Sequence, residues 1–486
     1  MRILFLQPLM FTPGYQTVSG DLRPMPNLGL LYIASIAKGF GEVEFEYVST
    51  YNVVKVIEQH SPDIVCLSVV TTQYPTVKEL CRIIKRVNEE ITIILGGYYP
   101  TFMFHSVLDE IPVDYIVVGE GEETFNKLME YLENNRGNLE DIEGLAFKKD
   151  GRKIFTGHRR LVDDLDKIPF PAWDIVNKKP KTIDFITSRG CPFPCEFCSI
   201  SAFYGRRFRV RSVENVIKEV EVLVKQGYKR FNMPDDNLLA DSGTLKEICE
   251  ALGKFDVKFA CQGRIDAIYR KPEILQVLHD AGCDTIALGL DSGIQEGLDA
   301  LNKKITLEQA KFVAEELENF GDITTVWFLM VGTADGSDTR SRIHESIDFA
   351  FSLPHDIIQL SILTPYPGTP LFNRLEAENR ILTYDWNKYD CCHCVYQPLG
   401  MAPEELERIW SETYYKVFMN KDILNPKKLK KLNVLRNTMS LSLSGITYFV
   451  SQFIRYLANN RSVYALFERD QKLFEKRIQE EISSSY

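Results

Sequence analysis

The segment FITSRGCPFPCEFC, residues 185–198, decides how the rest of the chain is interpreted. Its first six residues form a β-like run, and Cys191, Cys195 and Cys198 follow at C-x3-C-x2-C spacing. Three thiolates on one short loop can wrap one face of a cubane iron–sulfur cluster and leave the fourth iron without a protein ligand. An iron with an open position can chelate a small molecule, so the spacing predicts a 4Fe–4S cluster with a chemical role.

A structural zinc site is the alternative for these cysteines. Zinc would require a fourth Cys or His nearby, and none follows at finger-like spacing, so we favour the cluster. Isolated cysteines elsewhere have apolar neighbours, and we expect them to be small buried hydrophobic residues. They are Cys66, Cys81, Cys249, Cys261 and Cys283.

Length and composition limit the class of protein. A chain of 486 residues predicts two or three domains, and 45% hydrophobic with 26% charged residues is typical of a soluble globular protein. The net charge of -10 argues against a nucleic-acid partner, because neutralising phosphates requires a basic excess. The opening run MRILFLQPLMF lacks a small-residue cleavage site, so we interpret it as a strand and expect a reducing, cytoplasmic compartment.

Residues 1–135 alternate short β-rich runs with amphipathic stretches such as Tyr74 to Asn88. This alternation predicts an α/β, doubly wound, Rossmann-like domain, whose ligands bind at the carboxyl ends of the strands. Residues 136–178, with two short β-like pieces and the proline-containing LDKIPFPAWD, are expected to form a linker. The strand candidates are Ile3–Gln7, Glu42–Val48, Ile64–Val69, Ile91–Leu95 and Tyr115–Val118.

Residues 179–398 repeat the strand–helix alternation six times and predict a partial (β/α)6 barrel. The chemistry of such barrels gathers at the carboxyl ends of the strands. Residues 399–486 form a predicted helical region. The six strand candidates are FITSRG, KRFNMPD, KFACQG, TIALGL, TVWFLMVG and IIQLSILTP.

The pattern C-x3-C-x-aromatic-C, with Phe197 as the aromatic residue, resembles the signature of the radical S-adenosylmethionine superfamily. The resemblance implies that the open iron binds the methionine part of S-adenosylmethionine and that a 5′-deoxyadenosyl radical abstracts hydrogen from an unactivated carbon. It also implies that polar groups at the barrel strand ends bind S-adenosylmethionine, although relatives usually have Glu where Asp291 stands. The candidates are Asp235, Asp236, Arg264, Asp291, Ser292, Val331 and Gly332.

A doubly wound domain before such a barrel resembles the cobalamin-binding subclass of the superfamily, from PNLGLLYIA to LTPYPGTPLF. The resemblance implies that three strand-end loops hold the corrin and its nucleotide tail. The alternative is a domain that binds no corrin and only shapes the substrate pocket, because no D-x-H-x-x-G motif supplies a lower histidine. The candidate contacts are Ser68, Thr71, Gly96, Gly97, Gly119, Glu120 and Gly121.

Two further segments have open interpretations. DWNKYDCCHC groups Cys391, Cys392, His393 and Cys394, which can bind an extra metal or place one thiol near the substrate, and Tyr366 is equally ambiguous. In the C-terminal region, four lysines precede an uncharged run from Asn437 to Ile454, which predicts either a helix packed on the barrel or a contact with a membrane surface. The lysines are Lys427, Lys428, Lys430 and Lys431.

The leading hypothesis is a cobalamin-dependent radical S-adenosylmethionine enzyme that methylates an unactivated carbon of a small-molecule or lipid substrate. The second is a radical cyclase or oxidase acting on a porphyrin-like or isoprenoid-lipid-like substrate, and the third is a non-catalytic cobalamin or cluster sensor. The first two imply an electron donor such as flavodoxin or ferredoxin.

Overall fold

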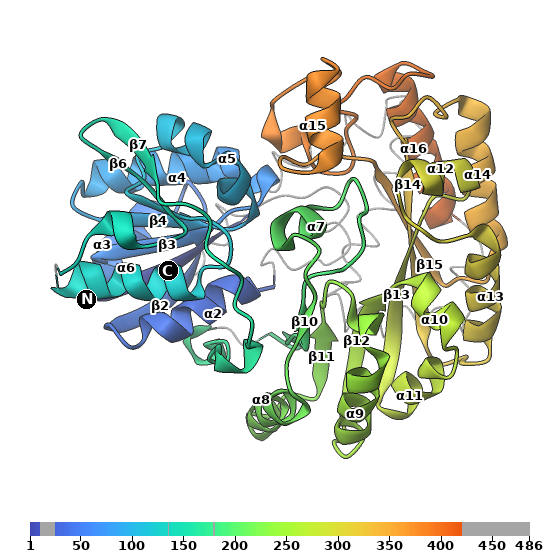
Figure 1. The fold of residues 1–486 in the computed structure, drawn as a ribbon, viewed down its shortest axis with the longest axis horizontal. Coiled ribbons are helices and arrows are strands. Elements are labelled where there is room, and N and C mark those ends of the chain that lie inside the picture. The colour runs from blue at the N-terminus through green and yellow to red at the C-terminus, as the bar shows by residue number, and fades with distance from the viewer. Residues whose placement is uncertain (10–24, 135, 178–179, 420–486) are drawn as a thin grey trace.

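The computed structural model describes residues 1–9, 25–134, 136–177 and 180–419. Figure 1 shows two sheet-based domains beside each other, with the short helix α7 (Ser199–Tyr204) between them. The first domain contains a seven-stranded sheet of order β2-β1-β3-β4-β5-β6-β7. Its strands are β1 (Arg2–Pro8), β2 (Glu42–Val48), β3 (Ile64–Ser68), β4 (Thr92–Gly96), β5 (Tyr115–Val117), β6 (Leu145–Lys149) and β7 (Arg152–Phe155).

Helices cover both faces of this sheet. In β1, Ile3 and Phe5 point into one hydrophobic cluster while Leu4 and Leu6 point into another, as the two-residue period of a strand requires. The first cluster includes α2 (Leu28–Ala37) and α6 (Glu122–Asn134). The second includes α3 (Val53–His60), α4 (Tyr74–Val87) and α5 (Tyr98–Glu110). The doubly wound prediction is confirmed, and each predicted strand agrees with the observed one to within one residue at either end.

Part of the segment predicted as a linker belongs to this sheet. Strands β6 and β7 pair antiparallel with each other, and β6 pairs antiparallel with β5. The connecting residues Asp150 and Gly151 have φ values of 51° and 76°, which suits the tight turn that joins two hairpin strands. This Asp-Gly pair is the sequence signal that identifies the hairpin.

The second domain is built on a six-stranded parallel sheet of order β15-β14-β13-β12-β11-β8. Helices α8 (Val213–Lys225), α9 (Ser242–Leu252), α11 (Ile274–Asp280), α13 (Leu307–Glu318) and α14 (Arg340–Ser352) line its outer side (Figure 1). The predicted partial barrel is therefore confirmed. Its strands are β8 (Ile183–Asp184), β11 (Arg230–Met233), β12 (Lys258–Gly263), β13 (Cys283–Asp291), β14 (Thr324–Val331) and β15 (Ile357–Ile362).

The first barrel strand differs from the prediction FITSRG. Only Ile183 and Asp184 pair with β11, and the chain then leaves the sheet. Ser188 and Arg189 form β9, which pairs antiparallel with β10 (Arg209–Val210). A side chain at the end of the next strand holds the residues that follow. The carboxylate of Asp235 accepts from the backbone N–H of Thr187, which is then not available to the parallel sheet, and from the hydroxyl of Ser188.

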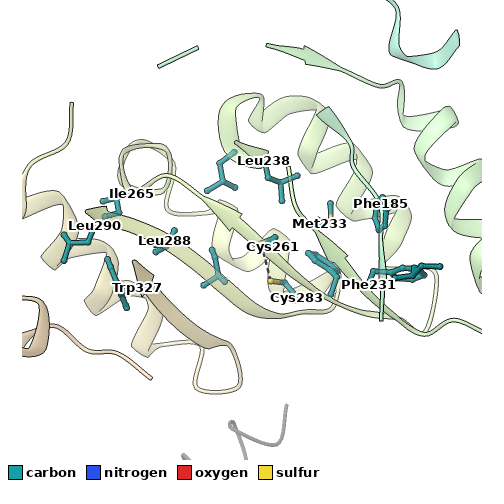
Figure 2. Packing of buried hydrophobic residues seen from close by; sticks show 14 of the residues in the cluster. Phe185, Phe231, Met233, Leu238, Cys261, Ile265, Cys283, Leu288, Leu290 and Trp327 are labelled. Atoms are coloured by element: carbon teal, nitrogen blue, oxygen red, sulfur yellow. Dashed lines mark hydrogen bonds between the residues drawn. The ribbon is translucent and has the colours of Figure 1, made fainter. Parts of the chain in front are cut away.

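Figure 2 shows the barrel core, where Phe185, Phe231, Leu288 and Trp327 pack between strands and helices. Two of the isolated cysteines meet there, with the sulfurs of Cys261 and Cys283 separated by 3.7 Å. All five isolated cysteines are buried, as predicted.

The described chain ends in α16 (Pro403–Met419). In the ranges that the structure describes, no helix combines the length and apolar character needed to cross a membrane. The basic cluster and the uncharged run predicted to contact either the barrel or a membrane lie outside the described residues.

Candidate functional site

The three cysteines of the cluster motif lie on one loop between β9 and α7. Gly190 enters this loop with φ of 86°, and a Cβ there would overlap the carbonyl oxygen of Arg207, so the position requires glycine. Cys191 and Cys195 are buried, while Cys198 is partly exposed beside α7.

The loop is fixed by hydrogen bonds from segments far away in the sequence. The side-chain amide of Asn302 donates to the carbonyl oxygen of Pro194 at 2.9 Å, and the backbone N–H of Glu196 donates to Leu301 at 3.3 Å. On the other side, the N–H of Leu371 donates to the carbonyl of Glu196 at 3.1 Å. Two segments of the barrel, one after α12 (Gln295–Ala300) and one in α15 (Pro370–Ala377), therefore hold the loop.

Two side-chain N–H groups lie beside the buried sulfurs of the cluster cysteines. Burial raises the pKa of Cys191 and of Cys198, so their thiolates require compensation by positive charge or by N–H donors. Two such donors are present. The Nδ2 atom of Asn237 lies 3.7 Å from the sulfur of Cys191, and Nη1 of Arg264 lies 3.7 Å from that of Cys195. Three soft thiolate ligands and these donors suit an iron–sulfur cluster.

This loop is not a preformed metal site. Within the described ranges, no three His, Cys, Asp or Glu side chains already converge on one point at metal-binding distance. The assignment of the cluster loop therefore depends on the cysteine spacing, on burial and on the two N–H donors.

Asp235 and Asp236, predicted to contact S-adenosylmethionine, hold the segment that leads into the cluster loop. One carboxylate oxygen of the fully buried Asp235 accepts from the backbone N–H and hydroxyl of Thr187 and from the hydroxyl of Ser188, at 2.6–3.0 Å. Asp236 accepts from the N–H of Gly190 at 2.7 Å, and burial raises its pKa to about 6. A contact of either carboxylate with the cofactor remains a prediction.

Arg264 is held by three partners besides Cys195. Its guanidinium donates to Asp266 at 2.8 Å and to the carbonyl of Lys303 at 2.6 Å, and it lies 3.6 Å from the ring centroid of Phe193. The buried Asp291, with φ of 65°, forms an ion pair with the buried Lys303. Arg264 and Asp291 thus lie on the same side of the barrel mouth, joined through Lys303.

The remaining predicted barrel residues lie near the same strand ends. The hydroxyl of buried Ser292 accepts from the N–H of Ile294 at 3.3 Å. Val331 ends β14 and is buried, and Gly332, with φ of 89°, adjoins the hydroxyl of Tyr396. Phe197 is partly buried against the barrel core.

A cavity of about 360 Å³ lies where the first domain faces the barrel. Its walls include barrel residues Ser188, Arg189 and Asp236, and Phe203 and Tyr204 of α7. The loops predicted to hold a corrin form the opposite wall. Thr71 is buried at the start of the η1 turn (Thr71–Gln73) and is not among the lining residues, whereas the other predicted residues are: Ser68, Gly96, Gly97, Gly119, Glu120 and Gly121.

Gly97 shows how closely this cavity wall is packed. Its φ is 99°, and a Cβ would lie 2.7 Å from the backbone nitrogen of Val69 and 2.8 Å from its oxygen. The next residue, Tyr98, contacts Phe203 of α7 with ring centroids 4.8 Å apart. The first residue of α5 therefore contacts the helix that follows the cluster cysteines.

Glu120 is the centre of a buried charge network between the domains. Its carboxylate accepts from Arg209 at 2.8 and 2.9 Å, from Arg189 at 3.1 Å and from the N–H of Val162 at 2.9 Å. Arg189 also pairs with Glu122 at 2.7 Å. The two carboxylates and two guanidiniums balance in charge. Their ion pairs join the loop after β5 to the residues that precede the cluster loop.

Sequence reasoning missed Arg189, Arg209, Asn237 and Lys303. Arg189 stands in the quoted FITSRG run and Asn237 directly follows Asp235 and Asp236, but their partners are 69 and 46 residues away in the sequence. Arg209 and Lys303 had no local signal that distinguished them from surface cations.

The DWNKYDCCHC segment does not bring its ligands together. Cys391 lies with its sulfur 3.2 Å from the hydroxyl of Tyr366, whereas His393 pairs through Nδ1 with Asp390 at 2.9 Å. Cys392 and Cys394 are buried. The side chains have separate contacts, and among the described residues they form no metal-binding group.

Comparison with known proteins gives matches to two families. Residues 22–129 match the B12 binding domain, and residues 185–350 match the radical SAM superfamily. An uncharacterized methyltransferase of Pyrococcus horikoshii is 30% identical over 414 residues, which cover 82% of this chain and 89% of that protein.

Two other similarities extend over most of the chain. The anaerobic magnesium-protoporphyrin IX monomethyl ester cyclase of Rubrivivax gelatinosus is 31% identical, over 87% of this chain and 78% of that one. The solved structure of OxsB, a cobalamin-dependent S-adenosylmethionine radical enzyme with aqua-cobalamin bound, has a TM-score of 0.71 at 19% identity. That alignment covers 100% of this chain and 81% of OxsB, and it supports the two-domain fold.

We expect Cys191→Ala to abolish cluster binding, because two thiolates cannot hold the cubane against loss of iron. Iron and sulfide content after anaerobic reconstitution would measure this. Cys249→Ala is the matched control, since Cys249 is buried away from the loop and should leave the iron content unchanged. Equal iron in both variants would contradict the cluster assignment.

Gly97→Ala should weaken cobalamin binding at least tenfold, because the added Cβ collides with the backbone at Val69 and the backbone at φ of 99° is strained for alanine. The neighbouring Gly96→Ala should have little effect, since its Cβ would meet its nearest atom at an ordinary 3.7 Å. Absorbance titration of the purified protein with hydroxocobalamin would give both dissociation constants. Similar affinities for the two variants would be evidence against this placement of the corrin.

Arg209→Met should destabilise the protein by about 3–5 kcal/mol, because it leaves the Glu120 carboxylate buried with one charged partner fewer. Arg207→Gln, two residues earlier, removes an ion pair whose side chains are 52% and 77% exposed, and it should cost about 0–1 kcal/mol. Urea unfolding followed by fluorescence would compare the two. A cost for Arg209→Met no larger than that for Arg207→Gln would show that the network does not stabilise the domain interface.

Proposed function

Because the chain belongs to the radical SAM superfamily, in the group whose members carry a B12 binding domain, we propose that it methylates an unactivated sp3 carbon of a small-molecule or lipid substrate. The protein is an enzyme, and its cofactors are a 4Fe–4S cluster, S-adenosylmethionine and cobalamin. An enzymatic function argues against the third hypothesis, a non-catalytic cobalamin or cluster sensor.

One observation supports methyl transfer above all, namely that a single cavity is lined by both domains. Gly97 and Gly119 at the strand ends of the first domain share it with Ser188 and Asp236 at the barrel mouth. When bound, the cluster and S-adenosylmethionine supply a radical that removes hydrogen from carbon, and methylcobalamin supplies the methyl group. A substrate held at this cavity can meet both groups without leaving the protein.

The residues of the chain support this reaction in three ways. Cys191, Cys195 and Cys198 hold the cluster on a loop that Asp235 and Asp236 keep in place. The network around Glu120 fixes the distance between the corrin loops and the cluster loop. Apolar walls, including Phe5, Cys66, Ile94 and Val117, exclude water from the depth of the cavity, which protects a reactive carbon.

Ring closure or oxidation is the second candidate, because the cyclase of Rubrivivax gelatinosus is as similar to this chain as the methyltransferase is. Both reactions begin with the same hydrogen abstraction, and they differ in the fate of the substrate radical. We further propose a flavodoxin-like or ferredoxin-like electron donor and a cytoplasmic location.

Consumption of S-adenosylmethionine distinguishes the two reactions. Methylation uses one molecule to form 5′-deoxyadenosine and another to methylate cobalamin, so we expect adenosylhomocysteine and deoxyadenosine in about equal amounts. The experiment incubates the reduced holoenzyme with methyl-deuterated S-adenosylmethionine and fractions of a lipid and small-molecule extract. Mass spectrometry should then find a product carrying the CD3 group.

Enzyme that lacks cobalamin is the control and should form no adenosylhomocysteine. Formation of deoxyadenosine together with a new ring or double bond, and without adenosylhomocysteine, would contradict methylation and show that the enzyme is a cyclase or oxidase.

A further inference from the structure

Two of the three cluster cysteines have a side-chain N–H donor of their own. Asn237 donates to the sulfur of Cys191 and Arg264 to that of Cys195, each at 3.7 Å. The thiol of Cys198 instead faces the backbone N–H groups of Ile200 and Ser201. Cys191, which also faces the backbone N–H of Phe193, has a neutral side-chain amide as donor, and Cys195 has a cationic one.

Asn237 is oriented by what it contacts. A thiolate only accepts hydrogen bonds, so the amide must turn its NH2 group toward Cys191 and its oxygen away. That oxygen is buried and has no hydrogen-bond partner among the described residues, and the whole residue is 1% exposed. An unpaired buried carbonyl oxygen costs about 1–3 kcal/mol, which an apolar residue at this position would avoid. An asparagine at this position is therefore unfavourable for stability, and the favourable contact that its side chain makes is the one with the sulfur of Cys191.

Arg264 is fixed even more firmly. Its contacts with Asp266, the carbonyl of Lys303 and the ring of Phe193 leave Nη1 directed at Cys195. The residue is 6% exposed, so its positive charge is little screened by water.

We propose that Asn237 and Arg264 are positioning residues that raise the reduction potential of the cluster through N–H···S hydrogen bonds. Reduction adds one negative charge to the cluster and its thiolates, so a donor stabilises the reduced state more than the oxidised state. Hydrogen bonding to the sulfurs is one of the factors that set cluster potentials in general. The inference depends on the cluster site assigned above and is independent of whether the reaction ends in methylation or cyclisation.

The test is a redox titration of the reconstituted holoenzyme followed by electron paramagnetic resonance, without substrate. Asn237→Leu keeps the approximate size of the side chain, removes the donor and removes the unpaired oxygen, so folding should not suffer. We expect its equilibrium constant for reduction by a given donor to fall about three- to tenfold, where tenfold corresponds to about 59 mV for a one-electron couple. Arg264→Gln should shift the equilibrium in the same direction by a larger factor, because a charged donor is lost.

Asn302→Gly is the matched control. Asn302 also donates to the cluster loop, but to the carbonyl of Pro194 and not to a sulfur. Its φ of 53° is one that glycine adopts without strain. This variant should therefore keep the wild-type potential, and a shift as large as that of Asn237→Leu would assign the effect to loop support and overturn the proposal.

Iron content is measured first for every variant, so that loss of the cluster is not confused with a change of potential. Asn237→Leu protein with full iron and an unchanged potential would refute the role of Asn237. If that variant retains no cluster, the wild-type enzyme with 15N-labelled asparagine provides the second measurement. Pulsed electron paramagnetic resonance of its reduced cluster should detect a hyperfine-coupled asparagine nitrogen. Absence of that coupling would equally refute the proposal. Wild-type protein without iron would instead refute the cluster site itself.

Discussion

The buried carboxylate of Glu120 is the constraint on which the arrangement of the two domains depends. Its side chain is 4% exposed and contacts Arg189 and Arg209, whose side chains are 10% and 6% exposed. A charge with so little solvent contact requires partners in fixed positions, since an unpaired buried ion is strongly unfavourable. Glu120 follows β5 in the first domain, and Arg189 stands two residues before Cys191. The ion pairs therefore set where the loops proposed to hold the corrin lie relative to the loop of the three cysteines.

Polar residues near the barrel mouth have a common structural role. Asp235 and Asp236 hold the residues that precede Cys191, and Arg264 is bound by Asp266 and Lys303 before any cofactor is considered. Hydrogen bonds and ion pairs to buried groups fix their side chains in place, so these contacts preorganise the mouth of the barrel. Such a frame holds the start and the middle of the short, glycine-preceded loop that carries the three cysteines. A radical reaction benefits, because the reacting groups must be held close together and away from water.

The cavity between the domains explains why one chain combines these two folds. Doubly wound sheets and (β/α) barrels both bind ligands at the carboxyl ends of their strands. Here those two ends face each other, with α7 between them and Tyr98 in contact with Phe203. Each domain alone would leave its cofactor exposed on one side. Facing each other, they line one common cavity.

The sequence by itself determined the parts that depend on local pattern. The cysteine spacing indicated the cluster, the alternation in residues 1–135 indicated the doubly wound sheet, and six strand–helix units indicated the barrel. The hairpin of β6 and β7 was also encoded locally, in Asp150–Gly151, although the segment was interpreted as a linker. The first barrel strand ends earlier than FITSRG predicts, and the backbone N–H of Thr187 donates to Asp235, from the next strand end, rather than within the parallel sheet.

Only the tertiary structure decided which polar residues meet. Glu120 was predicted as a cofactor contact from its loop, but its arginine partners are 69 and 89 residues further along the chain. No local pattern in MPDDN, residues 233–237, predicts that the Asn237 amide reaches a sulfur 46 residues earlier. Periodicity and spacing report the contacts of a residue with its sequence neighbours. The pairing of buried charges and donors is fixed only when distant strand ends are brought together, because burial is what makes those pairings necessary.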